Sequence, residues 1–522
     1  TVSTIYPKIR RDETVVDTYH GQKVSDPYRW LEDPDSEETK EFVEAQRKVF
    51  NEYFADYEPL CDQIKEKMKS LYNFERFSAP IPRKGKYLFS RNTGLQNQDV
   101  VYMSYTPEDK TGTVLLDPNQ WSTDGTVSLS AISSSYDATK LAFAVSESGS
   151  DWNTIKFMTF DDNRTRLADK LEHVKFSSFS WLADGSGGFY NIYDVEKKAD
   201  GTETTENTFS KTMYHRMCTD QCEDKIILHF PDKPGLIANV YATRDGQFLV
   251  ATIRSGCKTE NAIWIHQITE GETLDESIKW TELVPDDAAY MLIENKGTIF
   301  YFMTNFNKAD RFKVISIDVN NPKTENWKTI IEEDALDILE NCYCAHENYL
   351  IVNRIHHVKN ILSIHELDSG RKLAEFGEND IGSVSIESIE ASSDEHEVFF
   401  STSSFTSPRT VYRIDLNESM TVHMYNQVKF AGLDVSNVEI EQVFYNSSVD
   451  PRVKIPMYIL HSKNAPKDGT SPLFLYGYGG FGVNLMPIFS VQRLIWVCNF
   501  GGTLAIPNIR GGNEYGEQWH KD

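Results

Sequence analysis

Short stretches in which apolar and polar residues alternate fill the chain from about residue 74 to residue 431, separated by clusters of Gly, Asp, Asn and Ser. Alternation of this kind is typical of half-buried antiparallel strands joined by turns. A turn followed by an alternating strand recurs seven times, with copies that begin at Lys84, Asp137, Asp184, Asp245, Lys296, Glu347 and Asp394.

The residue numbers place these copies roughly 47 to 61 residues apart. That is the period of the four-stranded blades of β-propellers, whereas solenoid repeats are shorter. The pattern therefore predicts a seven-bladed β-propeller over residues 74–431. The first and last copies are the weakest, so counts of six or eight blades, and an irregular all-β region, are the alternatives.

Residues 1–73 are mixed in pattern, and none of the repeats lies within them. Asp35 or Ser36 is placed to cap a long helix, because a short polar side chain can accept from the first turn and the acids that follow favour the helix dipole. A second helix is predicted over residues 61–72. We therefore expect residues 1–73 to form a separate N-terminal segment.

The pattern changes again after Gly432. Residues 438–445 and 454–461 alternate as two strands of a hairpin. Residues 473–476 form a short apolar run that predicts a strand buried on both faces. A helix over 490–499 and a strand over 503–509 complete a βαβ unit, in which the two strands should be parallel.

Four glycines follow the strand at 473–476 within six positions, at 477, 479, 480 and 482. A strand interior does not tolerate that density, so the chain must leave the sheet by an unusual backbone path at the carboxyl end of a strand, where open α/β sheets place their ligands. Tyr478 lies between two of these glycines and could direct its hydroxyl at a developing negative charge. The alternative is an ordinary tight turn with an incidental tyrosine.

Several long motifs in the chain resemble the prolyl oligopeptidase family of serine peptidases. Phe474-Leu-Tyr-Gly-Tyr-Gly-Gly-Phe481 and Asn508-Ile-Arg-Gly-Gly-Asn-Glu-Tyr-Gly516, followed by Trp519-His520, carry the resemblance near the C-terminal end. Earlier in the chain it extends over residues 19–21, 26–34, 92–97, 148–152 and 200–204. One departure is Asn513, where the family pattern leads us to expect a third glycine.

The resemblance implies an α/β-hydrolase domain, incomplete in this chain, with an inserted propeller. Residues 432–522 would be the first part of that domain, and residues 1–73 would pack with it. The implied activity is cleavage of short peptides on the carboxyl side of proline, through an acyl-enzyme, with the propeller limiting substrate access.

Five residues match positions of the family that face the substrate. The resemblance implies that Tyr478 supplies one half of the oxyanion hole and that Phe481 forms an aromatic wall of the proline pocket. Phe176 and Cys257 match propeller residues that line the pocket for the third substrate position. Ile237 stands where we expect methionine, which leaves the shape of that subsite open. Core packing is the alternative for each of the five.

A serine nucleophile with the context Gly-x-Ser-x-Gly is absent from the sequence, although an α/β-hydrolase needs one together with a downstream acid and histidine. The resemblance implies that all three lie beyond Trp519-His520, so His520 and Asp522 are not expected to be triad members. Two alternatives follow. One is a peptidase of the oligopeptidase B type, which cuts after basic residues, and the other is a non-catalytic propeller that binds a partner.

The composition of the chain argues against several classes of binding partner. A formal net charge of −25 over 522 residues argues against binding to nucleic acid or anionic membranes. The seven cysteines are dispersed and odd in number, which is typical of reduced thiols in a cytoplasmic protein and lacks the paired spacing of a zinc finger. The start of the chain lacks the apolar core of a signal peptide, although it does not begin with methionine. We expect a cytoplasmic monomer that acts on short proline-containing peptides, without cofactor or metal.

Overall fold

The structure is a computed structural model that describes residues 6–194 and 206–522. The motif at residues 200–204 therefore lies outside the described residues. Contacts between residues divide the chain into two compact units. The first contains the described residues up to Ser70 together with Glu206, and the second contains the rest. None of the helices in the described ranges is long and apolar enough to cross a membrane.

The first unit is built from one hairpin and two helices. The hairpin joins β1 (Val16–Tyr19) to β2 (Gln22–Ser25), and α1 (Glu37–Phe54) and α2 (Glu58–Tyr72) follow. The Ser36 hydroxyl accepts a hydrogen bond from the Thr39 backbone N–H at 3.2 Å, which confirms the predicted cap. The second helix begins three residues before the predicted residue 61, because helical backbone continues through a 3₁₀ turn at Ala55–Tyr57.

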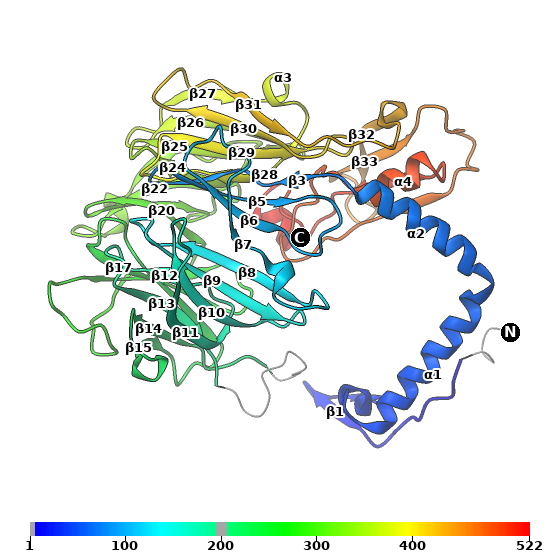
Figure 1. Cartoon of the computed structure of the whole chain (residues 1–522), viewed down its shortest axis with the longest axis horizontal. Coiled ribbons are helices and arrows are strands. Elements are labelled where there is room, and N and C mark those ends of the chain that lie inside the picture. The colour runs from blue at the N-terminus through cyan, green and yellow to red at the C-terminus, as the bar shows by residue number, and fades with distance from the viewer. Residues whose placement is uncertain (1–5, 195–205) are drawn as a thin grey trace. The chain divides into compact units, whose positions relative to one another are not determined.

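Seven groups of antiparallel strands occupy the described residues between Arg76 and Gln427 of the second unit (Figure 1). The second and third groups are joined into one eight-stranded sheet by the pair Val174–Ile192. In the first of them the innermost strand is interrupted, and both of its halves pair with the same neighbour. The strands of the first three are β3 (Arg76–Phe77), β4 (Ile81–Arg83), β5 (Lys86–Asn92), β6 (Val100–Ser104) and β7 (Thr113–Leu116); β8 (Val127–Ser134), β9 (Lys140–Glu147), β10 (Trp152–Thr159) and β11 (Arg166–Lys175); and β12 (Ser180–Trp181), β13 (Gly187–Ile192), β14 (Lys211–Arg216) and β15 (Lys225–His229).

The remaining four sheets each contain four consecutive strands in simple order. They are β16 (Leu236–Ala242), β17 (Phe248–Ser255), β18 (Asn261–Gln267) and β19 (Thr281–Val284); β20 (Tyr290–Lys296), β21 (Ile299–Thr304), β22 (Lys313–Asp318) and β23 (Lys328–Ile331); β24 (Ile338–Ala345), β25 (Tyr349–His356), β26 (Lys359–Glu366) and β27 (Lys372–Phe376), with a short helix α3 (Glu378–Ile381); and β28 (Ser385–Glu390), β29 (Glu397–Ser403), β30 (Thr410–Asp415) and β31 (His423–Gln427).

Each sequence repeat starts at the turn between the first and second strand of one of these sheets. The buried apolar side chains form clusters that each join a sheet to the next one along the chain. A further cluster joins the last sheet to the first, through Phe399 and Val411 of β29 and β30 and Ala79 beside β4. Strand groups linked in this closed order form a β-propeller.

The last sheet contacts the first through side chains. No strand pairing joins the two sheets among the described residues. The Tyr87 hydroxyl bonds to Glu397 across this junction. Lys110 Nζ donates to the Tyr425 carbonyl at 2.6 Å. The cluster of buried apolar residues at this junction is small, and these polar contacts add to it.

A mixed sheet follows the propeller, with strand order β32-β33-β35-β34. Its elements are β32 (Val438–Asn446), β33 (Lys454–Ser462), β34 (Leu473–Leu475), α4 (Val491–Cys498), β35 (Thr503–Pro507) and α5 (Glu517–Lys521). The hairpin of β32 and β33 is confirmed, and β34 pairs with β35 in parallel as predicted. Helix α4 covers one face, where Leu494 and Val497 pack with Tyr458, Leu460 and Leu504.

The predicted burial of the strand at 473–476 is wrong. Leu473, Phe474 and Leu475 are 59%, 54% and 63% exposed. The reason is that β34 is an edge strand, paired only with β35 among the described strands. Among the described residues, the one ring contact of Phe474 is with Trp496, at 6.2 Å between centroids.

One buried histidine links two propeller sheets. His215 of β14 is fully buried, with Nδ1 2.8 Å from Asp224 and Nε2 3.1 Å from Asp169 of β11. Burial lowers the pKa of His215, but the hydrogen bonds and charges of Asp224 and Asp169 outweigh it, so the pKa is raised. A ring bonded to carboxylates through both nitrogens is held as the cation.

We expect this histidine to make stability fall as pH rises. Because the folded-state pKa of His215 is raised, its contribution is complete below the unfolded value of about 6.5 and is lost as pH rises through the folded value. The free energy of unfolding should decrease by at most about 1.4 kcal/mol per pH unit from this group. Denaturant unfolding from pH 6 to 9 measures the slope, and His215→Gln should make it shallower. An equal slope in the variant would contradict the assignment.

Candidate active site

The loop that follows β34 and the loop that follows β35 interlock through their backbones. The Gly482 N–H donates to the Gly511 carbonyl at 2.9 Å. A Cβ on Gly511 would lie 2.0 Å from the Gly479 carbonyl oxygen, and one on Gly479 would lie 2.7 Å from the Arg510 carbonyl oxygen. Gly511 and Gly479 have φ of +96° and +65°. Both glycines are thus required by close approach and by left-handed backbone.

A buried carboxylate fastens these loops to the sheet. Glu514 Oε1 accepts from the Leu485 backbone N–H at 2.9 Å and from Asn508 Nδ2 at 3.1 Å. Burial raises the pKa of Glu514. Asn513, the departure from the expected glycine, is outside the left-handed region, so a side chain is accommodated at this position.

Tyr478 and Phe481 are presented at the surface of the first loop. Their exposed fractions are 48% and 77%. No hydrogen bond involves the Tyr478 hydroxyl among the described residues, so this donor is available to a ligand. Phe481 has φ of +55°, a conformation that costs a bulky residue free energy and that is concentrated at functional sites.

Helix α5 joins this part of the chain to the propeller. The Glu517 N–H donates to the Asp310 carbonyl at 2.9 Å, and Thr259 donates to the Glu517 carboxylate at 3.2 Å. Lys521 pairs with Glu260 at 3.6 Å. These contacts place the loop after β17 against α5.

The three predicted propeller residues belong to neighbouring strands and turns. The Phe176 ring packs edge-on against Tyr193, with centroids 6.0 Å apart. Arg254 is the direct cross-strand partner of Ile237. Cys257 follows in the turn after β17 and is exposed. Ile237 and Cys257 therefore lie at the same end of the β16–β17 pair, whereas the printed ring contact of Phe176 is with Tyr193.

The two loop residues and the three propeller residues do not contact each other directly in the described part of the chain. Among the described residues, no hydrogen bond, ion pair or ring contact joins Tyr478 or Phe481 to the propeller trio. The connection is indirect, since Gly511 accepts from His520 Nδ1 at 2.8 Å and α5, which holds His520, contacts Thr259 beside Cys257. Their roles toward a substrate remain predictions.

The chain matches known proteins over nearly its whole length. The family model "Prolyl oligopeptidase, N-terminal beta-propeller domain" matches residues 7–425. The prolyl endopeptidase of Elizabethkingia meningoseptica is 34% identical over 99% of this chain and 70% of its own length. The chain belongs to the prolyl oligopeptidase family. The predicted resemblance and the predicted propeller are both confirmed.

Solved structures of prolyl oligopeptidase family members have the same fold as this chain. Prolyl oligopeptidase B from Galerina marginata, bound to a 25mer macrocyclization substrate, matches with a TM-score of 0.90 at 30% identity, over 99% of this chain and 73% of that chain. A structure from a study of two prolyl endopeptidases and their inter-domain dynamics matches with a TM-score of 0.87 at 28% identity. This chain therefore corresponds to somewhat under three quarters of each relative.

Sequence reasoning missed the contacts that hold the loops in place. Glu340 of β24 is one, since its carboxylate is 3.3 Å from Asn484 Nδ2 and also accepts from Asn353 and Asn360. Burial raises the pKa of Glu340. A lone glutamate in an alternating strand carries no signal of this role. Glu514, by contrast, lies inside a motif that the sequence had already singled out.

Proposed function

We propose that the protein is a serine endopeptidase that cleaves short peptides on the carboxyl side of proline. The observation that carries the proposal is the Tyr478 loop. It places a phenol, which has no hydrogen-bond partner among the described residues, at the carboxyl end of a parallel strand. Family membership supports the same reaction, because several relatives are named prolyl endopeptidases.

In the proposed reaction a serine attacks the carbonyl carbon that follows the proline ring, and a histidine takes the hydroxyl proton. The carbonyl oxygen becomes an anion, which accepts a hydrogen bond from the Tyr478 hydroxyl. Expulsion of the amine, protonated by the same histidine, leaves an acyl-enzyme that water hydrolyses. Neither the serine nor its partners lie within residues 1–522 in the required sequence context. We assign them to a segment beyond His520.

Residues 432–522 would then form the first part of an α/β-hydrolase domain, with residues 1–73 as the N-terminal segment and the propeller over residues 74–431. Phe481 would contact the substrate proline. Phe176, Ile237 and Cys257 would line the pocket for the third substrate position. The propeller would admit short unstructured peptides and exclude folded proteins, in a cytoplasmic monomer.

Serine-reactive phosphonates and short peptides test the proposal together. The natural protein should hydrolyse a reporter peptide after proline, lose that activity on treatment with the phosphonate, and gain the mass of one label. Its intact mass should also exceed the 59.8 kDa of these 522 residues. A protein of about that mass that takes up no label would instead be a binding scaffold, and the proposal would fail.

A further inference from the structure

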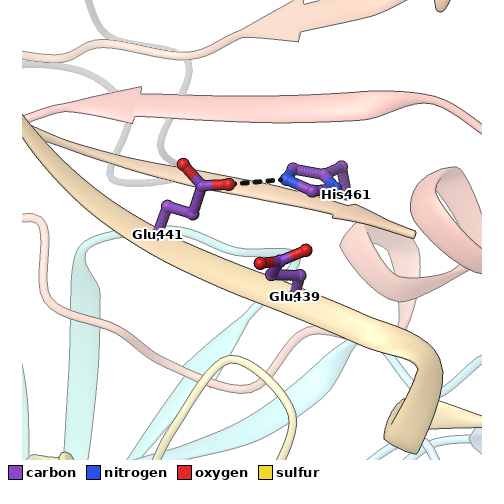
Figure 2. Close-up of side chains that lie close together, drawn as sticks. All are labelled: Glu439, Glu441 and His461. Carbon is purple, nitrogen blue, oxygen red and sulfur yellow. Dashed lines mark hydrogen bonds and ion pairs between the residues drawn. The ribbon is translucent and has the colours of Figure 1, made fainter. Parts of the chain in front are cut away.

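A histidine and two glutamates meet on the hairpin of β32 and β33, away from the Tyr478 loop. Glu439 and His461 are direct cross-strand partners, and Glu441 is two residues further along the same face of β32. The ligand atoms of the three side chains all lie within 4.8 Å of one another. Figure 2 shows both carboxylates directed toward the imidazole.

His461 is oriented by a group outside this trio. Its side chain is only 7% exposed, and Nδ1 is 2.8 Å from the Ser462 carbonyl oxygen. A carbonyl can only accept, so Nδ1 carries the proton and Nε2 of a neutral ring keeps its lone pair. A histidine that ligates a metal is typically held in this way, through a hydrogen bond from its other nitrogen to a carbonyl.

The lone pair on Nε2 faces a group that cannot donate. Nε2 is 3.1 Å from Glu441 Oε1, and none of the described residues donates a hydrogen bond to Nε2. Two acceptors at this distance require a cation between them, which is either a proton or a metal ion. The carboxylate of Glu439 favours a metal ion over a proton. A single proton between His461 and Glu441 has no use for Glu439, whereas a divalent ion gains a third ligand from it.

The charges nearby are compatible with a divalent cation. Lys467 Nζ is 3.2 Å from Glu441 Oε1, but its side chain is 71% exposed and can return to solvent at little cost. Two carboxylates and a neutral imidazole carry a charge of −2, which Zn²⁺ neutralises. Zinc bonds of about 2.0–2.2 Å place tetrahedral ligands roughly 3.3 Å apart, so a small rotation of the half-exposed glutamates completes the geometry.

We propose that Glu439, Glu441 and His461 form a zinc-type divalent-cation site, with three protein ligands and a fourth position open to water. The site differs from the metal-free expectation drawn from the cysteine spacing. It lies on the face of the sheet opposite α4, because His461 alternates with the buried residues Tyr458 and Leu460. A bound ion would clamp the two strands of the hairpin together.

Calorimetry with Zn²⁺ tests the proposal on the whole protein, with exposed thiols alkylated so that cysteine does not contribute. We expect one saturable site, and His461→Gln and Glu439→Gln should each weaken it by at least about tenfold.

His266 provides a matched control. Its Nδ1 is 3.0 Å from the Lys279 carbonyl and its Nε2 is 3.0 Å from Glu272, without a third ligand in the trio arrangement. His266→Gln should leave zinc binding unchanged, and thermal unfolding without zinc should show that all variants are folded. Binding that persists in Glu439→Gln, or no saturable binding in the wild type, would overturn the proposal and leave a proton-bridged His461–Glu441 pair.

Discussion

Tyr478→Phe should lower kcat for proline peptides by about 10²–10³, the loss typical of removing one oxyanion donor. The hydroxyl has no internal hydrogen bond among the described residues and Tyr478 is 48% exposed, so its removal leaves the fold intact. Because the hydrogen bond forms only to the developing oxyanion, kcat and kcat/KM should fall together while KM stays nearly constant. Steady-state kinetics of the natural protein and the variant measure both.

Tyr476→Phe is the matched control for this variant. Tyr476 precedes the glycine loop, is 38% exposed, and its ring lies 5.7 Å from the Arg493 guanidinium carbon. A contact with the ring face survives loss of the hydroxyl, so kcat should be unchanged. An unchanged kcat in Tyr478→Phe as well would remove Tyr478 from the mechanism.

Gly511→Ala should destabilise the C-terminal sheet and its loops by about 3 kcal/mol. The new Cβ would lie 2.0 Å from the Gly479 carbonyl oxygen, and neither backbone can retreat without breaking the Gly482 to Gly511 hydrogen bond. Overpacking of this kind costs roughly 1–3 kcal/mol, and a left-handed alanine adds about 1 kcal/mol. Denaturant unfolding followed by tryptophan fluorescence reports the loss.

Gly501→Ala separates the cost of the steric clash from the cost of left-handed backbone. Gly501 has φ of +65°, yet a Cβ there would meet nothing within 4 Å. This variant should lose only about 1 kcal/mol, from left-handed backbone alone. Equal losses at positions 501 and 511 would show that the loops are not interlocked as described.

The propeller was predictable because its signal is repeated. Each copy of the repeat begins at a turn, and turns such as those at Gly246 and Gly297 require positive φ, so they are marked by glycine and polar residues. An error in one copy leaves the period intact. The N-terminal helix was predictable for a similar local reason, since Ser36 caps it through a bond to a residue three positions away.

The burial of β34 could not be read from its sequence. Phe474 and its neighbours are apolar whether or not a partner strand covers them, and only the sheet order shows that β34 is an edge strand here. The start of α2 was missed by three residues because a 3₁₀ turn carries no distinct apolar pattern.

The candidate site was predictable in part. The glycine density identified the Tyr478 loop from backbone physics, but the interlock with Gly511 depends on a contact between segments about 30 residues apart, which spacing does not reveal. Phe176, Ile237 and Cys257 were found only through family resemblance, because an exposed aromatic or thiol in a propeller turn has no distinguishing local pattern. The trio on the β32–β33 hairpin was visible only once the strand register paired Glu439 with His461.

A competition assay on one peptide decides whether the protein cleaves after proline or after a basic residue. A short unstructured peptide with one internal proline and one internal arginine is incubated with the natural protein, and the fragments are weighed by mass spectrometry. We expect a single cut on the carboxyl side of proline, which disappears after treatment with a serine-reactive phosphonate. A cut after arginine, or a peptide that stays intact, would contradict it.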